Sequence, residues 1–169
     1  MTYAVSATRT LDKPILDKLD VTAQTVDVGE TGKIVESSDG RKYKKVVVDE
    51  SAIAAVAGSP AWYMIGTTAN EVTSDYSDAT VNEQLGAAFA GVFTSVITGD
   101  IAEYVWIEVP NGAVTADAIT AAEVGICDGL VATNDASFSI SSSDSDRIVA
   151  VAMEAYASGG SDIVMLHVR

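Results

Sequence analysis

The sequence predicts a mainly β protein: a compact antiparallel β-barrel or sandwich with one or two short helices and an extended N-terminal arm. Two observations lead to this class. The apolar residues are mostly small or β-branched, with 25 Ala and 22 Val against 3 Phe and 2 Trp, which suits thin, closely packed strands. Short apolar runs also alternate with Gly and Asp turns at regular spacing, as in sandwiches and barrels. We expect residues 1–25 to form the arm and residues 26–169 to form one β-rich domain.

The N-terminal segment, residues 1–25, has no sustained hydrophobic period. It mixes charges of both signs and carries the apolar pair Ile15 and Leu16 directly after a proline. A segment with so little core of its own becomes ordered by lying on a neighbour. We therefore expect it to be an extended arm.

The first predicted hairpin surrounds the turn Ser-Ser-Asp-Gly at residues 37–40. Gly40 can supply the positive φ that a tight turn needs, and the flanking residues 33–36 and 41–48 are strand-like. The return strand, Arg-Lys-Tyr-Lys-Lys-Val-Val-Val, is strongly basic in an acidic chain. We expect it to be a contact edge.

Residues 49–60 predict one short helix, with acids first, alanines in the middle, and a glycine and a proline at the end. Residues 61–82 are turn-rich and irregular, although Trp62, Tyr63 and Met64 suit core or interface anchors. Residues 83–91 suit either a second helical turn or an irregular lead-in.

The β signal is strongest in the second half of the chain. Residues 91–98 and 103–109 alternate apolar and polar side chains around a Gly-Asp turn, which predicts a hairpin. The remaining strands are expected around Ile119, at 128–133, at 137–141 and, as a closing hairpin, at 147–157 and 162–168.

The charge is unevenly distributed along the chain. Residues 46–146 contain 15 acids and no Lys, Arg or His, within a total net charge of −14. Such a body repels phosphate backbones and anionic lipids, so we expect neither nucleic acid nor a membrane as partner. The acidic surface serves solubility, and the near-neutral ends are candidates for facing a partner. With no apolar run of about 18 residues and no leader-like start, the chain is expected to fold in a cytoplasm.

Few residues offer catalytic chemistry. The sole histidine, His167, lies near the end on the same strand face as Ile163 and Met165, which is typical of a packed or interfacial side chain. A Ser or Cys nucleophile would need a base nearby, and the glycine turns match no phosphate-binding motif. We expect no enzyme activity and no cofactor.

Metal and thiol chemistry are also weakly indicated. Asp75 with Asp78, and Asp144 with Asp146, can offer oxygen ligands to calcium, but neither pair has the spacing of an EF-hand loop. We expect no specific metal site. The single cysteine, Cys127, excludes an internal disulfide framework and suits a small buried hydrophobe.

Four segments, in order, resemble the small phage head decoration or cement proteins. They are GKIVESSDGRKYKKVVV at 32–48, AIAAVAGSP at 52–60, GVFTSVITGDIAEYVWIEVPNG at 91–112, and CDGLVAT at 127–133 followed by IVAVAMEAYASGGSDIVMLHV at 148–168. The match covers about residues 32–169. It departs from the family at Cys127-Asp128-Gly129, where Gly-Asp is expected, and in the arm and residues 67–82, which match nothing.

The resemblance implies a virion structural protein without enzyme activity, bound to the outer surface of the capsid. It would act as a homotrimer that clamps the major capsid protein lattice, and two near-neutral ends are compatible with that role. The residues expected at capsid or subunit interfaces are Ile15, Leu16, Arg41, Tyr43, Lys45, Trp62, Tyr63, His167 and Arg169. Each is also compatible with an ordinary core or exposed position.

Two other functions remain open from the sequence. One is a different virion surface module, such as a head-fibre base, a tail component or a glycan-binding domain. There Trp62, Tyr63 and Tyr76 would form a platform for sugars. The other is an enzyme or metal-binding module that uses His167 or the carboxylate pairs.

Overall fold

The computed structural model describes most of the chain beyond its first 22 residues. The described residues are 23–27, 29, 31–37, 40–49, 52–64, 70–75, 88–99, 101–110, 115–120, 123–133, 136–142, 148–155 and 161–166. Every regular element among them is a strand. The strands are β1 (Ile34–Glu36), β2 (Lys42–Val48), β3 (Pro60–Tyr63), β4 (Glu71–Thr73), β5 (Ala88–Phe93), β6 (Glu103–Val109), β7 (Thr115–Ile119), β8 (Gly129–Ala132), β9 (Phe138–Ile140), β10 (Ala150–Ala152) and β11 (Ser161–Leu166).

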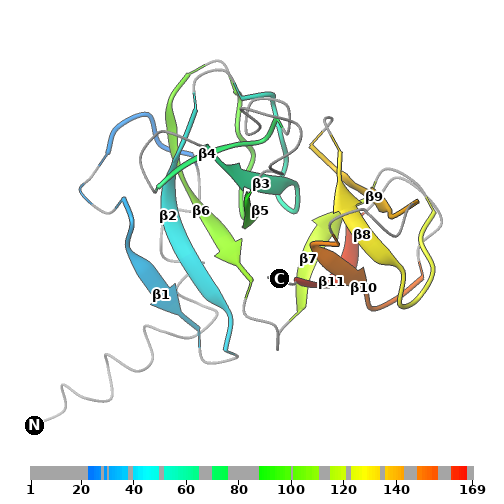
Figure 1. Cartoon of the computed structure of the whole chain (residues 1–169). Coiled ribbons are helices and arrows are strands. Elements are labelled where there is room, and N and C mark those ends of the chain that lie inside the picture. Colours follow the sequence, from blue (N-terminus) through cyan, green and yellow to red (C-terminus); the bar gives the residue numbers. More distant parts are fainter. Residues whose placement is uncertain are drawn as a thin grey trace, which may run out of the picture.

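The first six strands form a closed barrel with one added strand. The order is β1-β2-β4-β3-β5-β6, and a further pairing of β2 with β6 closes β2, β4, β3, β5 and β6 into a ring (Figure 1). Strand β1 is not part of the ring and pairs with the edge of β2. The pairs are antiparallel except for β2 with β4, which is parallel. The predicted fold class, mainly β with a barrel, is confirmed.

The barrel interior is filled by small and β-branched side chains. It includes Val46 of β2, which pairs with Val105 of β6, together with Val48 of β2 and Ile107 of β6, all fully buried. Their alternation with the residues between them puts one face of each strand inside the ring. The high Ala and Val content of the sequence is therefore used to fill a narrow barrel.

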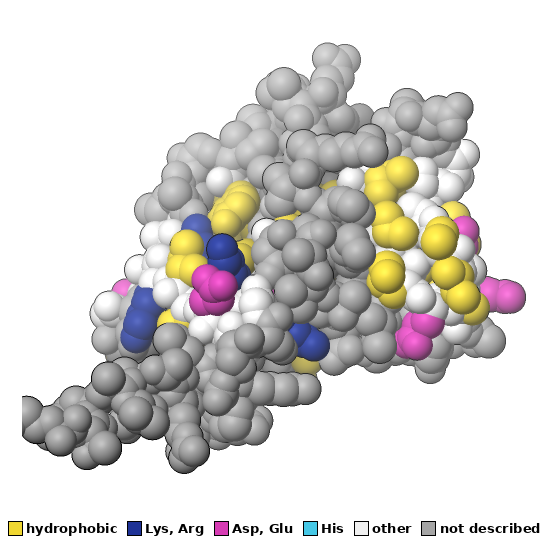
Figure 2. Space-filling model, turned by 90° about the horizontal axis from the view of Figure 1, so that it is seen from below, with side chains coloured by type: hydrophobic (Ala, Val, Ile, Leu, Met, Phe, Trp, Pro, Cys, Tyr) yellow, Lys and Arg dark blue, Asp and Glu magenta, His cyan; other side chains and the backbone are white. Residues whose placement is uncertain are grey.

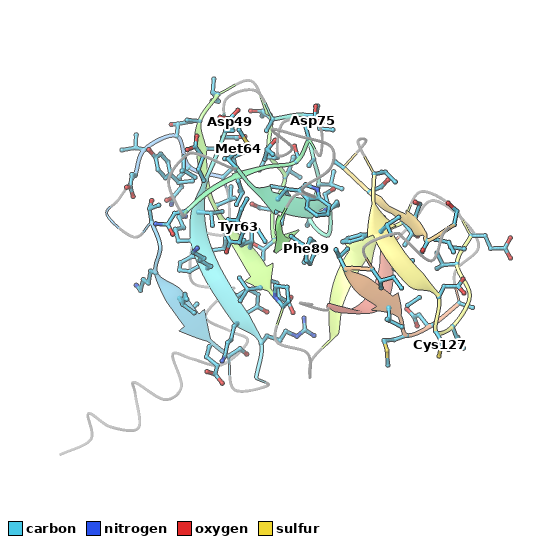
Figure 3. The ribbon with its side chains drawn as sticks, viewed as in Figure 1. Asp49, Tyr63, Met64, Asp75, Phe89 and Cys127 are labelled. Atoms are coloured by element: carbon cyan, nitrogen blue, oxygen red, sulfur yellow. The ribbon has the colours of Figure 1, made fainter. Side chains whose placement is uncertain are left out.

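The last five strands form a second sheet in the order β7-β11-β10-β8-β9. It packs against the outer face of β3 and β5, where Trp62 and Phe89 share one buried cluster with Leu130 and Phe138. Phe89 contacts both Trp62 and Phe138 edge-on, with ring centroids 5.4 Å and 6.0 Å apart. Figure 3 shows Phe89 on the side of the barrel that faces the second sheet.

A β-bulge in β5 makes both contacts possible. Ala61 pairs with Gly91 and Trp62 pairs with Phe89, so one extra residue, Ala90, is inserted. The insertion changes the side-chain alternation. As a result, Phe89 and Val92 face the second sheet while Ala90 and Phe93 face the barrel interior.

The helix expected at 49–60 is wrong: residues 52–60 contain no helical residue. Ala55 instead forms an antiparallel bridge with Ile97, with hydrogen bonds of 3.2 Å and 2.9 Å between their backbones. Ala52 and Ala55 are both buried in the barrel core. The small side chains let the backbone lie directly on the barrel, and this tertiary pairing outweighs alanine's helix propensity.

Other predicted elements were found with changed limits. The strand at 103–109 was predicted to the residue. The strand expected at 91–98 instead spans Ala88–Phe93. Residues 88–91, for which a helical turn was one alternative, are therefore part of a strand. The chain bends at Thr94, and strands β3 and β4 lie in the region expected to be irregular.

Candidate interaction surface

The basic strand β2 is an interior strand of its sheet. It pairs with β1 and β4 on one side and with β6 on the other, so the expectation that it is a contact edge is wrong. The three residues of this segment that were expected at interfaces, Arg41, Tyr43 and Lys45, each have neighbours within the chain. A strand in this position has few backbone groups left for a partner.

Lys45 is buried on the outer face of the barrel, with 1 % of its surface exposed. It lies opposite Trp106, its Nζ is 5.5 Å from the centre of the Trp106 ring, and it donates a hydrogen bond of 3.4 Å to Gln24 Oε1. A buried ammonium is costly unless it has such partners. In the isolated chain, therefore, Lys45 makes intramolecular contacts.

The start of the described chain holds Lys45 from both sides. Gln24 and Tyr104 exchange backbone hydrogen bonds of 3.1 Å and 2.7 Å on the β6 side. Gly32 and Lys33 hydrogen-bond the backbone of Lys45 on the other side. The connection between Gln24 and Gly32 thus joins the two sides of the β2–β6 pair. Ala23 and Gln24, assigned by sequence to the arm, pack on the barrel.

Tyr43 is buried two pairs further along the β2–β6 register, opposite Glu108. Arg41 is only half-buried, and its Nη1 lies 3.7 Å from Glu108 Oε2. Of the three expected sites on this segment, Arg41 is the one that reaches the surface. Figure 2 shows Lys and Arg side chains gathered with an acidic side chain on the barrel side of the molecule.

Trp62 and Tyr63 are consecutive in β3 and point to opposite faces. Trp62 is 2 % exposed and belongs to the aromatic contact with the second sheet. Tyr63 is half-buried at the barrel core, where Lys44 Nζ lies 3.3 Å from its hydroxyl and 4.8 Å from its ring centre. Because Trp62 is interior, these two residues do not form a flat aromatic surface for a sugar.

The other expected sites fall outside the described residues: Ile15, Leu16, Tyr76, His167 and Arg169, and the carboxylates of Asp78, Asp144 and Asp146. Asp75 is described and half-buried, and its backbone N–H donates to Thr73 Oγ1 at 3.0 Å. No cluster of three or more His, Cys, Asp or Glu suited to a metal occurs within the described ranges. Across the same ranges, no helix is long and apolar enough to cross a membrane.

The structure also reveals an exposed apolar surface that was not predicted from the sequence. We call it the β8–β10 patch; it consists of Ile126, Cys127, Ile148 and Met153. Ile126 and Met153 are 63 % and 43 % exposed, and Cys127 and Ile148 are exposed as well. Figure 2 shows hydrophobic side chains gathered on this side of the second sheet, with acidic side chains at the margin.

Backbone pairing brings the patch residues together. Cys127 N donates to Ala152 O at 2.9 Å, and Gly129 pairs with Val151. Ile148 lies over Gly129, where an added Cβ would be 2.7 Å from its Cδ1. The patch is on the side of the sheet opposite the core, since Leu130, Ala150 and Ala152 point into the buried cluster.

Cys127 was expected to be buried, and this is wrong. Ile126 and Cys127 occupy the centre of a tight turn that Asp128 closes by accepting a 2.6 Å hydrogen bond from Gly125 N. Cys127 has a φ of +71° there and lies at the outer end of the second sheet (Figure 3), and both side chains of the turn are exposed. The Gly-Ile-Cys-Asp-Gly sequence carried this signal, because flanking Gly and Asp mark a turn.

Comparisons with known proteins give no family for this chain. No family model matches it, and no curated protein matches it. Among solved structures, it is similar to the crystal structure of the head fiber gp8.5 N base in bacteriophage phi29, with a TM-score of 0.49 and 12 % sequence identity. That similarity covers 74 % of this chain and 94 % of the other. A likeness of this extent defines neither a family nor a function.

Proposed function

We propose that this protein is a structural component of a phage virion that binds the outer surface of the assembled head. In the specific form of the proposal it is a decoration protein. It assembles as a homotrimer and stabilises the lattice of the major capsid protein, without enzyme activity, cofactor or nucleic acid.

The observation that carries the proposal is the set of hairpins formed by the segments that resemble decoration proteins. Residues 32–48 form the β1–β2 hairpin, in which Ser37 N donates to Arg41 O at 2.8 Å and Gly40 has a φ of +86°. Residues 91–112 contribute to the antiparallel β5–β6 pair, and residues 148–168 to the β10–β11 pair. Three of the four resembling segments thus contain an antiparallel pair of strands, which supports a resemblance in local structure as well as in sequence.

The charge distribution is consistent with a lattice clamp. The residues from 46 to 146 carry only acids among their charged side chains, so the body repels other virions and stays soluble. A protein that binds only the assembled lattice stabilises it by linkage, and even a few kcal/mol per site is large when repeated over many sites. This mechanism requires no reactive residue.

Capsids that lack their decoration protein provide the test. Purified protein is mixed with such capsids and with capsids already saturated by native decoration protein, and binding is followed by sedimentation and electron microscopy. We expect saturable binding at fixed lattice positions on the first and none on the second. Protein that stays free while the native decoration protein binds normally would contradict the proposal.

The trimer is tested separately by size-exclusion chromatography with light scattering. We expect a mass of three chains at high concentration, and a monomer at every concentration would exclude it. The glycan-binding alternative is tested on a glycan array, where selective retention would favour that alternative. The buried position of Trp62 argues for no retention.

A further inference from the structure

The β8–β10 patch is an apolar surface with an acidic margin. Glu123 comes three residues before Ile126, Glu154 directly follows Met153, and both are exposed. Asp128 directly follows Cys127. Apolar side chains this exposed favour burial against a partner. A partner that fits both features is a short apolar segment flanked by bases.

The sequence of this chain contains such a segment. Residues 13–18 read Lys-Pro-Ile-Leu-Asp-Lys, so two adjacent aliphatic residues lie between Lys13 and Lys18, and with Asp17 the segment has a net charge of +1. The other concentration of bases, on β2, is already paired within the barrel. Complementary charge at the rim and apolar contact in the centre is the common arrangement of a protein interface.

The length of the chain decides which copy can supply the segment. Leu16 precedes Ala23 by seven residues, a span of at most about 25 Å when fully extended. Gln24 is fixed against β6 of the barrel, whereas the patch faces away from the barrel on the far side of the second sheet. A segment that starts at β6 would have to extend past the barrel and reach the outer face of the second sheet to contact the patch of its own chain.

We propose that the β8–β10 patch is the docking site for residues 13–18 of a second copy of this chain. The proposal deepens the proposed function and rests on it in one respect, because it supplies the subunit contact that a homotrimer needs. The contact is head-to-tail, and such contacts close into rings when the rotation between copies allows it. Three arms held in one ring reinforce each other through high effective concentration.

Cys127, the single cysteine of the chain and a member of the patch, provides a direct test. One chain carries Ile15→Cys together with Cys127→Ser, and the second keeps Ile15 and Cys127 and has a small size tag. The two are mixed without capsids and oxidised mildly. We expect a disulfide-linked heterodimer of the two sizes on a non-reducing gel, because a bond between positions 15 and 127 can form only between copies.

The control uses Ser6→Cys with Cys127→Ser in the first chain, which places the thiol nine residues upstream. We expect several-fold more heterodimer from Ile15→Cys than from this control. Equal yields would overturn the proposal. In a chain that carries both Ile15→Cys and native Cys127, a fast-migrating internally linked monomer as the main product would overturn the assignment to a second copy.

Patch variants test the surface itself. Met153→Asp and Ile126→Asp in the tagged chain should each remove the excess of heterodimer and weaken self-association by roughly tenfold or more. Ile34→Asp, at an equally exposed aliphatic residue on β1, should leave both unchanged. Circular dichroism confirms that each variant is folded. Since no capsid is present, absence of the 15–127 link between chains with an unaltered patch overturns this proposal alone, whereas failure of capsid binding overturns only the capsid role.

Discussion

Lys45 and Trp106 face each other across β2 and β6, and the Lys45 ammonium lies 5.5 Å from the centre of the indole ring on the outside of the barrel. The pair is almost completely buried. It is covered by a part of the chain, around Gln24, that the sequence assigns to an arm. A basic residue that looks like a contact for a partner therefore fastens the N-terminal connection to the barrel.

Replacement of Lys45 separates its packing from its charge. Lys45→Ala removes a buried aliphatic stem, and we expect the free energy of unfolding to fall by about 2–3 kcal/mol. Lys45→Met keeps most of that stem, and we expect a change within about 1 kcal/mol because exchange of a buried charge for a hydrophobe is often neutral. Urea denaturation measures both.

The matched control is Lys42→Met, at a side chain that is 46 % exposed on the same strand, with an expected change within about 0.5 kcal/mol. Capsid binding gives the second measurement. If Lys45 is internal in the bound state too, Lys45→Met binds as the parent protein does. A loss of binding with unchanged stability would restore Lys45 as a capsid contact.

Gly91 is required by the contact between β5 and β6. Its φ is +148°, and a Cβ added there would overlap the backbone carbonyl oxygen of Glu108. We expect Gly91→Ala to destabilise the protein by about 3 kcal/mol or more, since backbone on both sides must move. Gly29→Ala is the control: its φ is +78° but nothing lies within 4 Å, so only the conformational penalty of about 1 kcal/mol applies. Similar losses for both variants would show that β5 can shift.

The aromatic contact of Phe89 with Phe138 joins the barrel to the second sheet. We expect Phe138→Ala to lower the free energy of unfolding by about 3–5 kcal/mol. A double-mutant cycle with Phe89→Ala should give a coupling of about 1 kcal/mol. Phe93→Ala, in the separate barrel cluster, should be additive with Phe138→Ala.

The same denaturation curves test whether residues 26–169 behave as one domain. Because one buried cluster contains residues of both sheets, we expect a single transition that is identical by tryptophan fluorescence and by far-UV circular dichroism. Two resolved transitions would show that the barrel and the second sheet are separate folding units.

Elements stabilised by local signals were predicted well from the sequence. The strand at Glu103–Val109 alternates clearly, and the β1–β2 hairpin has a glycine at the position that needs positive φ. The segment with Ala52 and Ala55 failed because its conformation depends on Ile97, more than 40 residues away. Composition favoured a helix there, and only the barrel surface against which it packs determines the extended form.

The candidate surface was harder to predict than the fold. Burial of Lys45 and Trp62 depends on segments distant in sequence, Gln24 and the second sheet respectively. Exposure of Ile126 and Cys127 depends on the four-residue turn Gly125–Asp128, so this exposure could be predicted from the local sequence. Alternation identifies which residues share a face of a strand, but the packing of other elements decides whether that face meets solvent.

Two truncations locate the boundary between arm and body. Removal of residues 1–22 keeps Gln24, so we expect the free energy of unfolding to stay within about 0.5 kcal/mol of the parent value. Removal of residues 1–25 also eliminates the two backbone hydrogen bonds between Gln24 and Tyr104 and the contact with Lys45, which should cost about 2 kcal/mol.

Both truncations should weaken capsid binding and self-association to a similar extent if the arm makes those contacts. Urea denaturation and sedimentation with capsids measure the two effects on the same samples. Unchanged capsid binding after removal of residues 1–22 would place the binding surface on the β-body. A large loss of stability from that shorter truncation would instead show that residues before Ala23 belong to the folded core.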